Sequence, residues 1–254
     1  PDAFYGGSMT LFIKPLTTLE EFEACLSVQK ETWRFDDIDT VPVNIIRVFA
    51  DKTDPWGIVL GAFDGNKLVG FTLCLPTSHP ATYLAHMLAV IPSYQEKGVG
   101  GLLAQAATQV CLDRGVKKVV ATFDPLESRN AHIYIKRMGA IGKSYVRNYY
   151  SHLTCALENE LPTDRLKIEF FLDPSVDTYS SLRQTKDPLA CIEIPDNITS
   201  IKEIDKKAAL ELRLRTRQEF EDLMKKGFVV VGFDHEPKNQ KGRYWLVRDT
   251  TVQT

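Results

Sequence analysis

Two glycines separated by one residue stand where a predicted helix begins, shortly after an apolar strand. The segment contains Gln95, Lys97, Gly98 and Gly100. Glycines leave main-chain N–H groups uncovered, and the first turn of a helix carries the positive end of its dipole. Such a segment can bind a pyrophosphate, to which Lys97 would add a positive charge. We therefore expect the chain to bind a phosphate-bearing cofactor through its main chain.

Two other phosphate-binding motifs fit this segment less well. A P-loop requires G-x-x-x-x-G-K-[ST], and the sequence has no such string. A Rossmann fingerprint requires a third glycine where this sequence has Leu103. Asp124, at the end of the next predicted strand, is the one feature that still favours a dinucleotide. A dinucleotide-dependent oxidoreductase therefore stays an alternative.

Strand and helix patterns alternate around the motif. Apolar runs predict strands over 83–90 and 116–123, on either side of a helix over 99–114 that Gly115 ends. This order predicts a right-handed parallel crossover. A shorter helix over 128–138 follows and ends at Gly139.

The remaining elements frame this crossover on both sides. Upstream, the sequence predicts a strand over 11–15, a helix opened by the capping box Thr18-x-x-Glu21, a helix over 43–50 and a hairpin of strands over 56–63 and 68–75. Downstream, it predicts strand character over 140–157, strands over 166–172 and 189–194, a linker over 174–187, a helix capped by Ser200-x-x-Glu203 that reaches Lys226 and stops at Gly227, and a hairpin of 228–233 and 243–247.

The string Gln95-x-x-Gly98-x-Gly100 resembles the acetyl-CoA pyrophosphate loop of the GNAT acetyltransferase superfamily, whose pattern is Q/R-x-x-G-x-G/A. The likeness extends loosely over residues 11–157. The strings FDPL (123–126), SRNA (128–131) and LPTDRL (161–166) look like a poorly characterised bacterial and archaeal branch of GNAT-like proteins with an extra C-terminal portion. The resemblance implies an α/β fold: a mixed central sheet with a parallel strand-helix-strand core, plus a smaller α+β C-terminal portion.

The resemblance also implies a set of cofactor contacts. Main-chain groups of Leu88 and Val90 would pair with the pantetheine arm of acetyl-CoA or another acyl-CoA, between the ends of the two strands of the crossover. The pyrophosphate would bind the amides of Gln95, Glu96, Lys97, Gly98, Val99 and Gly100. Asn130 would lie near the CoA arm, and Lys97 or nearby basic residues near the 3'-phosphate. The resemblance implies no metal.

Acyl transfer to an amine needs a base for the ammonium proton and an acid for the leaving thiolate. His86 is the first candidate base, with Asp124 and Glu127 after it. GNAT enzymes often place a tyrosine four residues before the glycine that ends the helix, where this chain has Ile135. Tyr134, one residue earlier, is the candidate acid, with a packing role as the alternative. One residue is about 100° of rotation around an α-helix, which would point its ring away from the sulfur.

Several of these residues also have a purely structural interpretation. Asp124-Pro125 is a typical turn and helix cap. The three tyrosines at positions 145, 149 and 150 suggest cross-strand packing. Arg213, Arg215 and Arg217 suggest a solvated helix face, with a pocket for an acidic substrate as the alternative.

Composition sets the broader expectations. With 31 Lys+Arg against 33 Asp+Glu, the chain has no overall basic field for nucleic acid or a membrane surface. The wide spacing of the five cysteines indicates small buried side chains and not disulfides or a metal site. Free cysteines are typical of a reducing compartment, so we expect the protein in the cytoplasm. Residues 1–9 look like a cloning remnant and the start of the chain, residues 10–160 like an acyl-CoA-binding domain, and residues 161–254 like a C-terminal α+β portion.

The resemblance to the GNAT superfamily therefore implies an acyl-CoA-dependent N-acyltransferase, using acetyl-CoA, that acts on a small-molecule or peptide amine by direct attack in a ternary complex. The alternative is a non-catalytic acyl-CoA-binding or regulatory protein, motivated by Ile135. The sequence indicates no oligomeric state.

Overall fold

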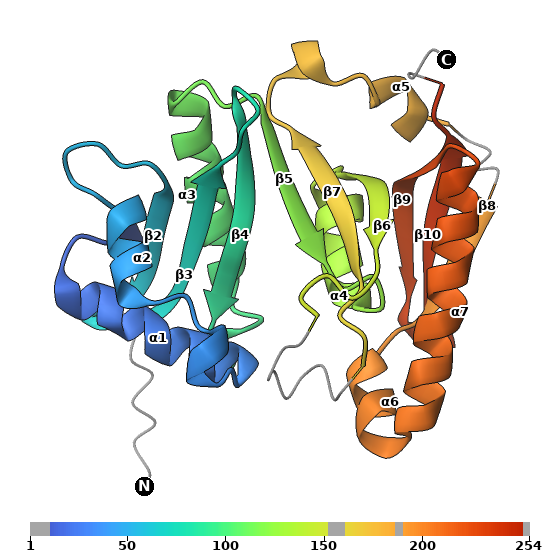
Figure 1. Cartoon of the computed structure of the whole chain (residues 1–254), viewed down its shortest axis with the longest axis horizontal. Helices are drawn as coiled ribbons and strands as arrows, with labels where there is room; N and C mark the ends of the chain where they lie inside the picture. The colour runs from blue at the N-terminus through green and yellow to red at the C-terminus, as the bar shows by residue number, and fades with distance from the viewer. Residues whose placement is uncertain (1–10, 152–160, 186–189, 251–254) are drawn as a thin grey trace, which may run out of the picture. The chain divides into compact units, whose positions relative to one another are not determined.

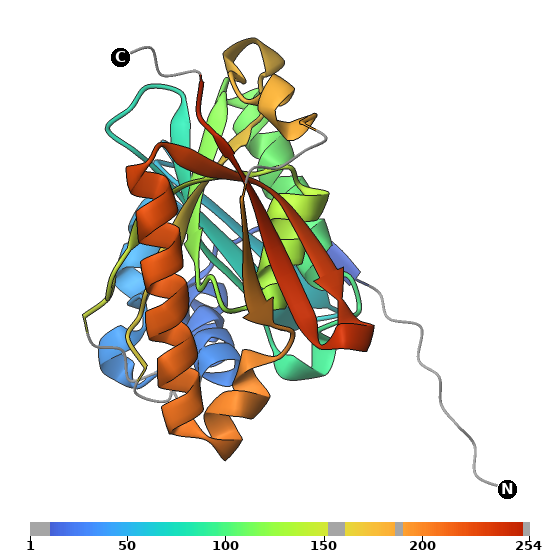
Figure 2. The ribbon, with the colours of Figure 1, turned by 90° about the vertical axis from the view of Figure 1, so that its right-hand side faces the viewer.

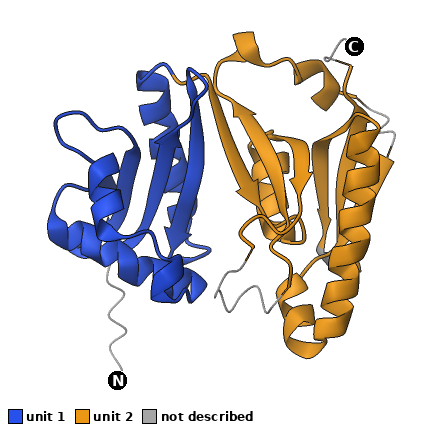
Figure 3. Cartoon of the chain, viewed as in Figure 1, with its two compact units in different colours: residues 1–115 blue, residues 116–254 orange. Residues whose placement is uncertain are grey.

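The computed structural model describes residues 11–151, 161–185 and 190–250, which fall into two units, residues 1–115 and 116–254 (Figure 3). The predicted remnant at residues 1–9 and the end of the predicted strand over 140–157 lie outside the described residues. The predicted crossover joins a strand of one unit to a strand of the other, so it stays a prediction.

In the part of unit 1 that the structure describes, four antiparallel strands lie in the order β1-β2-β3-β4. These are β1 (Leu11–Pro15), β2 (Ile58–Asp64), β3 (Lys67–Pro76) and β4 (Thr82–Val90). Figure 1 shows α1 (Leu19–Trp33) and α2 (Val43–Phe49) in front of the strands and α3 (Val99–Asp113) behind them. The 3-10 turns η1 (Asp37–Asp39) and η2 (Pro92–Tyr94) complete this unit.

Local signals in the sequence account for much of unit 1. Thr18 Oγ1 accepts a hydrogen bond from the amide of Glu21 (3.3 Å), and the Thr18 amide donates to Glu21 Oε2 (3.1 Å), so the capping box is confirmed. Gly65 has a φ of +58° in the β2–β3 turn, as a tight hairpin requires. The predicted hairpin is therefore confirmed.

The described residues of unit 2 form six strands in the order β5-β7-β6-β9-β10-β8, every neighbouring pair antiparallel. They are β5 (Lys118–Phe123), β6 (Ile141–Val146), β7 (Arg165–Phe171), β8 (Ala190–Pro195), β9 (Phe228–Glu236) and β10 (Lys241–Arg248). The helical segments are α4 (Ser128–Ala131), η3 (His132–Arg137), η4 (Pro174–Val176), α5 (Ser180–Arg183), α6 (Ile198–Ile204), α7 (Lys206–Lys225) and η5 (Pro237–Asn239). α7 packs against β6, β8 and β9, and Figure 2 shows it beside the β9–β10 hairpin.

The long C-terminal helix is interrupted, contrary to the sequence prediction. Asn197 Oδ1 caps α6 by accepting from the amide of Ser200 (3.1 Å), and Asp205 Oδ1 caps α7 by accepting from the amide of Ala208 (2.9 Å). Ser200 therefore lies inside α6 and is not its cap. Gly227, with a φ of +80°, follows α7 as predicted.

The predicted helix over 128–138 changes type after one turn. Only α4 is α-helical, and η3 is a π-helix, in which the amide of Met138 donates to the carbonyl of Ile133 five residues back (3.0 Å). The predicted linker over 174–187 also differs from expectation, because it carries η4 and α5 and buries Tyr179.

β7 links the two predicted domains. It comes from the predicted C-terminal portion and lies between β5 and β6, which come from the predicted acyl-CoA-binding domain. The division into two compact units falls between Gly115 and Val116 in the sequence. The domain boundary at residue 160 stays a prediction.

Candidate functional site

The loop before α3 presents a row of main-chain amides. Gly98 is the N-cap of α3 and has a φ of +83°, a left-handed conformation that favours glycine. Among the described residues, the amides of Lys97, Gly98, Val99 and Gly100 meet no backbone or side-chain acceptor. These amides lie at the positive end of the helix dipole, so they form a site suited to a phosphate.

Two side-chain hydrogen bonds anchor this loop to the strands. Gln95 Nε2 donates to the carbonyl of Val90 at the end of β4 (3.0 Å). The hydroxyl of Tyr94 donates to Asp64 Oδ2 (2.7 Å), and this bond raises the pKa of Tyr94. Lys97 Nζ lies 5.1 Å from the centre of the Tyr94 ring. The amides therefore belong to a loop that is held in place before any ligand binds.

Leu88 and Val90, the predicted pantetheine contacts, both lie in β4, opposite Thr72 and Gly70 of β3. The carbonyl of Val90 already accepts the Gln95 bond. A Cβ atom at Gly100 would lie 3.4 Å from Leu88 Cδ2, an ordinary contact. Gly100 is therefore not required by crowding in the protein.

His86 lies at an irregularity in β4. Leu73 of β3 pairs with Met87 and Cys74 pairs with Ala85, which leaves His86 as the extra residue of a β-bulge. Bulges redirect a side chain out of the regular alternation of a strand. Burial lowers the pKa of His86, so its imidazole is neutral at pH 7.

Tyr134 lies in the π-helix η3, which changes the expectation for its direction. The amide of Ala140 donates to the carbonyl of Tyr134, six residues back in the sequence (3.0 Å). At the end of an ordinary α-helix, the corresponding bond reaches only five residues back. The extra residue of the π-turn offsets the one-residue displacement from the Ile135 position. The α-helical geometry behind the predicted 100° offset is therefore wrong.

The Tyr134 ring packs against aromatic residues of unit 2. Its centre lies 5.4 Å from that of Phe123 and 6.0 Å from that of Phe170, both with edge-to-face geometry. Burial raises the pKa of Tyr134, so its hydroxyl keeps its proton over the neutral range. Ile135 is 2% exposed and packs in the core.

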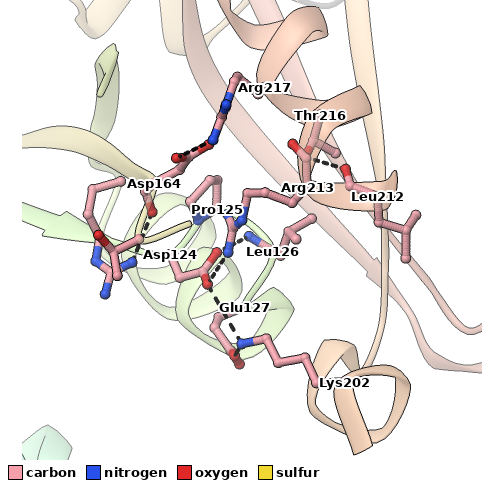
Figure 4. A network of polar contacts seen from close by, with 12 residues as sticks. Asp124, Pro125, Leu126, Glu127, Asp164, Lys202, Leu212, Arg213, Thr216 and Arg217 are labelled. Atoms are coloured by element: carbon pink, nitrogen blue, oxygen red, sulfur yellow. Dashed lines mark hydrogen bonds and ion pairs between the residues drawn. The ribbon is translucent and has the colours of Figure 1, made fainter. Parts of the chain in front are cut away.

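Asp124 makes an ion pair (Figure 4). Its Oδ2 accepts from Arg213 Nη2, and its Oδ1 accepts from the amide of Leu126 (2.8 Å), as the predicted turn requires. Burial alone would raise the pKa of Asp124, but Arg213 and Lys202 outweigh burial and lower it to about 2. A carboxylate this acidic is a weak base, and its contacts favour a structural role.

The other candidates of unit 2 follow Asp124 closely. Lys202 Nζ lies 3.6 Å from Glu127 Oε1, and the Glu127 side chain is 33% exposed. Asn130 lies in α4 and is half-buried. Unit 2 therefore brings together Asp124, Glu127, Asn130 and Tyr134 along one stretch of chain, whereas His86 and the amide loop belong to unit 1.

The solvated-face interpretation of the α7 arginines is wrong for Arg213, which is completely buried. Arg217 donates to both oxygens of buried Asp164 (2.8 and 2.9 Å), and only Arg215 pairs at the surface, with Glu219. A signal existed in the sequence: the buried residues of α7 recur at steps of three and four, Ala209, Arg213, Thr216 and Phe220. A charge in an otherwise buried stripe indicates a buried partner.

The described cysteines are free: Cys25, Cys74 and Cys111 are buried, as predicted, whereas Cys191 is exposed. Within the described ranges, no helix is long and apolar enough to cross a membrane, and no group of three or more potential metal ligands occurs.

Comparison with known proteins shows what the chain is similar to. Residues 19–140 match the acetyltransferase (GNAT) family model. The chain is 26% identical over 116 residues to N-alpha-acetyltransferase 30 of Schizosaccharomyces pombe (strain 972 / ATCC 24843), which covers 44% of this chain and 75% of that protein. The Escherichia coli ribosomal-protein-S18-alanine N-acetyltransferase has a TM-score of 0.52 at 15% identity, covering 66% of this chain and 98% of that one.

The structure of the NatC complex bound to Gag peptide and CoA gives a TM-score of 0.50 at 19% identity, covering 65% of this chain and 100% of that one. These similarities confirm the predicted GNAT-like mixed α/β fold. Over residues 19–140, slightly under half of its length, the chain is similar to the acetyltransferase (GNAT) family.

Proposed function

We propose that this chain is an acetyl-CoA-dependent N-acetyltransferase that transfers the acyl group to an amine by direct attack in a ternary complex. The observation that carries the proposal is the row of amides from Lys97 to Gly100, which meet no acceptor among the described residues and lie at the start of α3 within the segment that matches the family. Main-chain N–H groups at a helix start suit the pyrophosphate of CoA. The NatC complex, which has a similar fold, binds CoA.

The residues of unit 1 would bind the donor. The amides of Lys97 to Gly100 would hold the two phosphate groups, and Lys97 would add a positive charge beside them. Gln95 would act by holding the loop against β4. When bound, acetyl-CoA supplies the thioester whose acyl carbon the amine attacks.

The proposed proton transfers follow from the state of each side chain. His86 is neutral at pH 7 because its pKa is lowered, so it can accept the proton that the attacking ammonium loses. Tyr134 is protonated because its pKa is raised, so it can donate a proton to the departing thiolate. Glu127 is the alternative base. The low pKa of Asp124 fits a positioning role better than that of a base.

The proposed acceptor is an amine on a small molecule or a peptide. Two of the similar proteins are an N-alpha-acetyltransferase and a ribosomal-protein alanine N-acetyltransferase, and this similarity favours the amino group of a peptide. The free thiols of the described cysteines favour a reducing compartment, which fits the cytoplasm.

The test combines CoA calorimetry with a turnover assay. The protein is mixed with acetyl-CoA and a panel of peptide and small-molecule amines, and release of free thiol is followed. Binding of CoA together with transfer to at least one amine supports the proposal. Tight CoA binding without transfer to any amine supports the non-catalytic alternative. Thermal stabilisation by NAD(H) but not by CoA would support the oxidoreductase and overturn the proposal.

A further inference from the structure

The four residues Asp124 to Glu127 form a turn, here called the 124–127 turn, that connects β5 to α4. The amide of Glu127 donates to the carbonyl of Asp124 (3.0 Å), and the amide of Ala131 donates to the carbonyl of Glu127 (3.0 Å). The first turn of α4 therefore continues directly from the 124–127 turn. Any movement of this turn changes the start of the segment that carries Asn130 and Tyr134.

Arg213 of α7 contacts the first residue of this turn (Figure 4). Its Nη2 donates to Asp124 Oδ2, while Asp124 Oδ1 accepts the Leu126 amide within the turn. Arg213 has no exposed surface, and Asp124 is 7% exposed. The two residues are 89 positions apart in sequence. Their ion pair therefore connects α7 to the backbone of the turn.

Two more buried side chains from the C-terminal portion contact the same turn. Lys202 of α6 is 2% exposed, and its Nζ lies 3.6 Å from Glu127 Oε1 and 3.9 Å from Asp124 Oδ2. Tyr244 of β10 has no exposed surface, and its hydroxyl donates to the carbonyl of Pro125 (2.8 Å). Charged or hydroxyl groups from α6, α7 and β10 thus converge on the four residues of the turn.

Stability alone does not account for Arg213. Its Nε and Nη1 atoms are buried without a hydrogen-bond partner among the described residues. Burying a guanidinium costs several kcal/mol in desolvation, and a packed apolar residue is often equally stable or more stable at such a position. A buried ion pair of this kind is better explained by the single conformation that it imposes on its partner.

We propose that Arg213, acting through Asp124, is a positioning residue for the acyl transfer proposed above. With Lys202 and Tyr244, it fixes the 124–127 turn so that α4 and η3 hold Tyr134 in its working position. The C-terminal portion thereby supports catalysis without supplying a group that touches the substrate. The inference rests on the proposed function.

The experiment measures kcat, the KM for acetyl-CoA and the Kd for CoA in Arg213→Met, Arg213→Lys and the surface control Arg215→Met. The expected result for Arg213→Met is a fall in kcat of about tenfold or more, with a Kd for CoA within about twofold of wild type, because the amide loop lies in unit 1. Arg213→Lys keeps one donor for Asp124 and recovers part of kcat. Arg215→Met leaves kcat, the KM for acetyl-CoA and the Kd for CoA unchanged.

A double variant tests whether Arg213 acts through Asp124. If it does, Asp124→Asn/Arg213→Met loses no more kcat than Arg213→Met alone, whereas independent roles make the two losses multiply. Multiplied losses, or a folded Arg213→Met with wild-type kcat, overturn the proposal.

Tyr244→Phe keeps the test decisive if Arg213→Met does not fold. Its ring keeps its packing against Phe220 and Phe233 and loses only the hydrogen bond to Pro125. We expect a kcat about threefold lower with an unchanged Kd for CoA, and a wild-type kcat would contradict the positioning role. Wild-type turnover is measured first: its absence with every amine overturns the proposed function, whereas turnover that none of these variants alters overturns only the positioning role.

Discussion

Tyr134 lies five residues before Gly139, and the π-helical turn between them places the two in the relation that residues four apart have in an α-helix. Tyr134 stands one residue before the usual position of this tyrosine, which Ile135 occupies. The extra residue of the π-turn compensates for this displacement. π-Turns inside helices occur frequently at functional sites. The relation makes Tyr134 the best candidate for the acid that protonates the thiolate.

Replacing Tyr134 by Phe tests this role. The ring contacts with Phe123 and Phe170 remain, so the fold should persist, while kcat should fall by about 10- to 100-fold because the acid is lost. In the wild type, the raised pKa of Tyr134 keeps the hydroxyl protonated, so activity should decline only as the pH rises above the ordinary value of about 10. A pH–rate profile of both proteins checks this, and an unchanged kcat in the variant rules out the acid role.

Alanine substitutions at Gly98 and Gly101 test the phosphate loop, with Gly98→Ala as the test variant and Gly101→Ala as its control. Gly98 has a φ of +83°, so Gly98→Ala should cost about 1–2 kcal/mol of folding stability and disturb the amides, weakening CoA binding by about tenfold or more. Gly101 lies inside α3 with no atom within 4 Å of an added Cβ. Gly101→Ala should therefore leave the Kd for CoA unchanged and raise stability by about 0.5–1 kcal/mol. Calorimetry and urea unfolding measure both effects, and equal CoA affinities in the two variants would contradict the amide site.

The lowered pKa of His86 predicts how the rate falls on the acidic side of the pH–rate profile. A base must be unprotonated to act, and burial lowers the pKa of His86 below its ordinary value of about 6.5. The value of kcat/KM should therefore stay constant as the pH falls to about 6.5 and drop only below it. His86→Gln should lower kcat by about 100-fold and abolish this limb. A limb that persists in His86→Gln but disappears in Glu127→Gln would assign the base to Glu127.

The Asp124–Arg213 pair predicts a stability loss in acid. The folded pKa of Asp124, about 2, lies below its unfolded value, so its contribution is present above about pH 4 and is lost as the pH falls toward 2. The shift corresponds to a loss on the order of 2 kcal/mol in the free energy of unfolding. Asp124→Asn should be less stable at pH 7, because Arg213 loses its partner, and should lack this acid-dependent loss. Urea unfolding between pH 2.5 and 7 measures the free energy of unfolding of the wild type and of Asp124→Asn. If this free energy varies with pH in the same way in both proteins, Asp124 is not the group responsible.

Features that depend on neighbouring residues in the sequence were accessible without the structure. The Thr18-x-x-Glu21 box, the turn at Gly65, the glycine after α7 and the Gln95-to-Gly100 motif each combine a residue type with a local backbone requirement. These signals predicted where elements begin and end and where a phosphate could bind.

Features set by distant partners were not accessible in this way. The sequence shows no local sign of the π-turn at Tyr134, whose ring packs against the distant residues Phe123 and Phe170. Arg213 looks like a surface residue until Asp124, 89 positions away, is placed beside it. Propensity and periodicity describe single elements, whereas an ion pair between elements is fixed only by tertiary packing.

The position of β7 between β5 and β6 has a consequence for the order in which the molecule is made. While the ribosome has released only the chain up to β6, the facing edges of β5 and β6 have no strand between them. This sheet can close only once Phe171 has emerged, and the buried Arg213 arrives later still. Maturation of unit 2 during translation must therefore wait for the last third of the polypeptide.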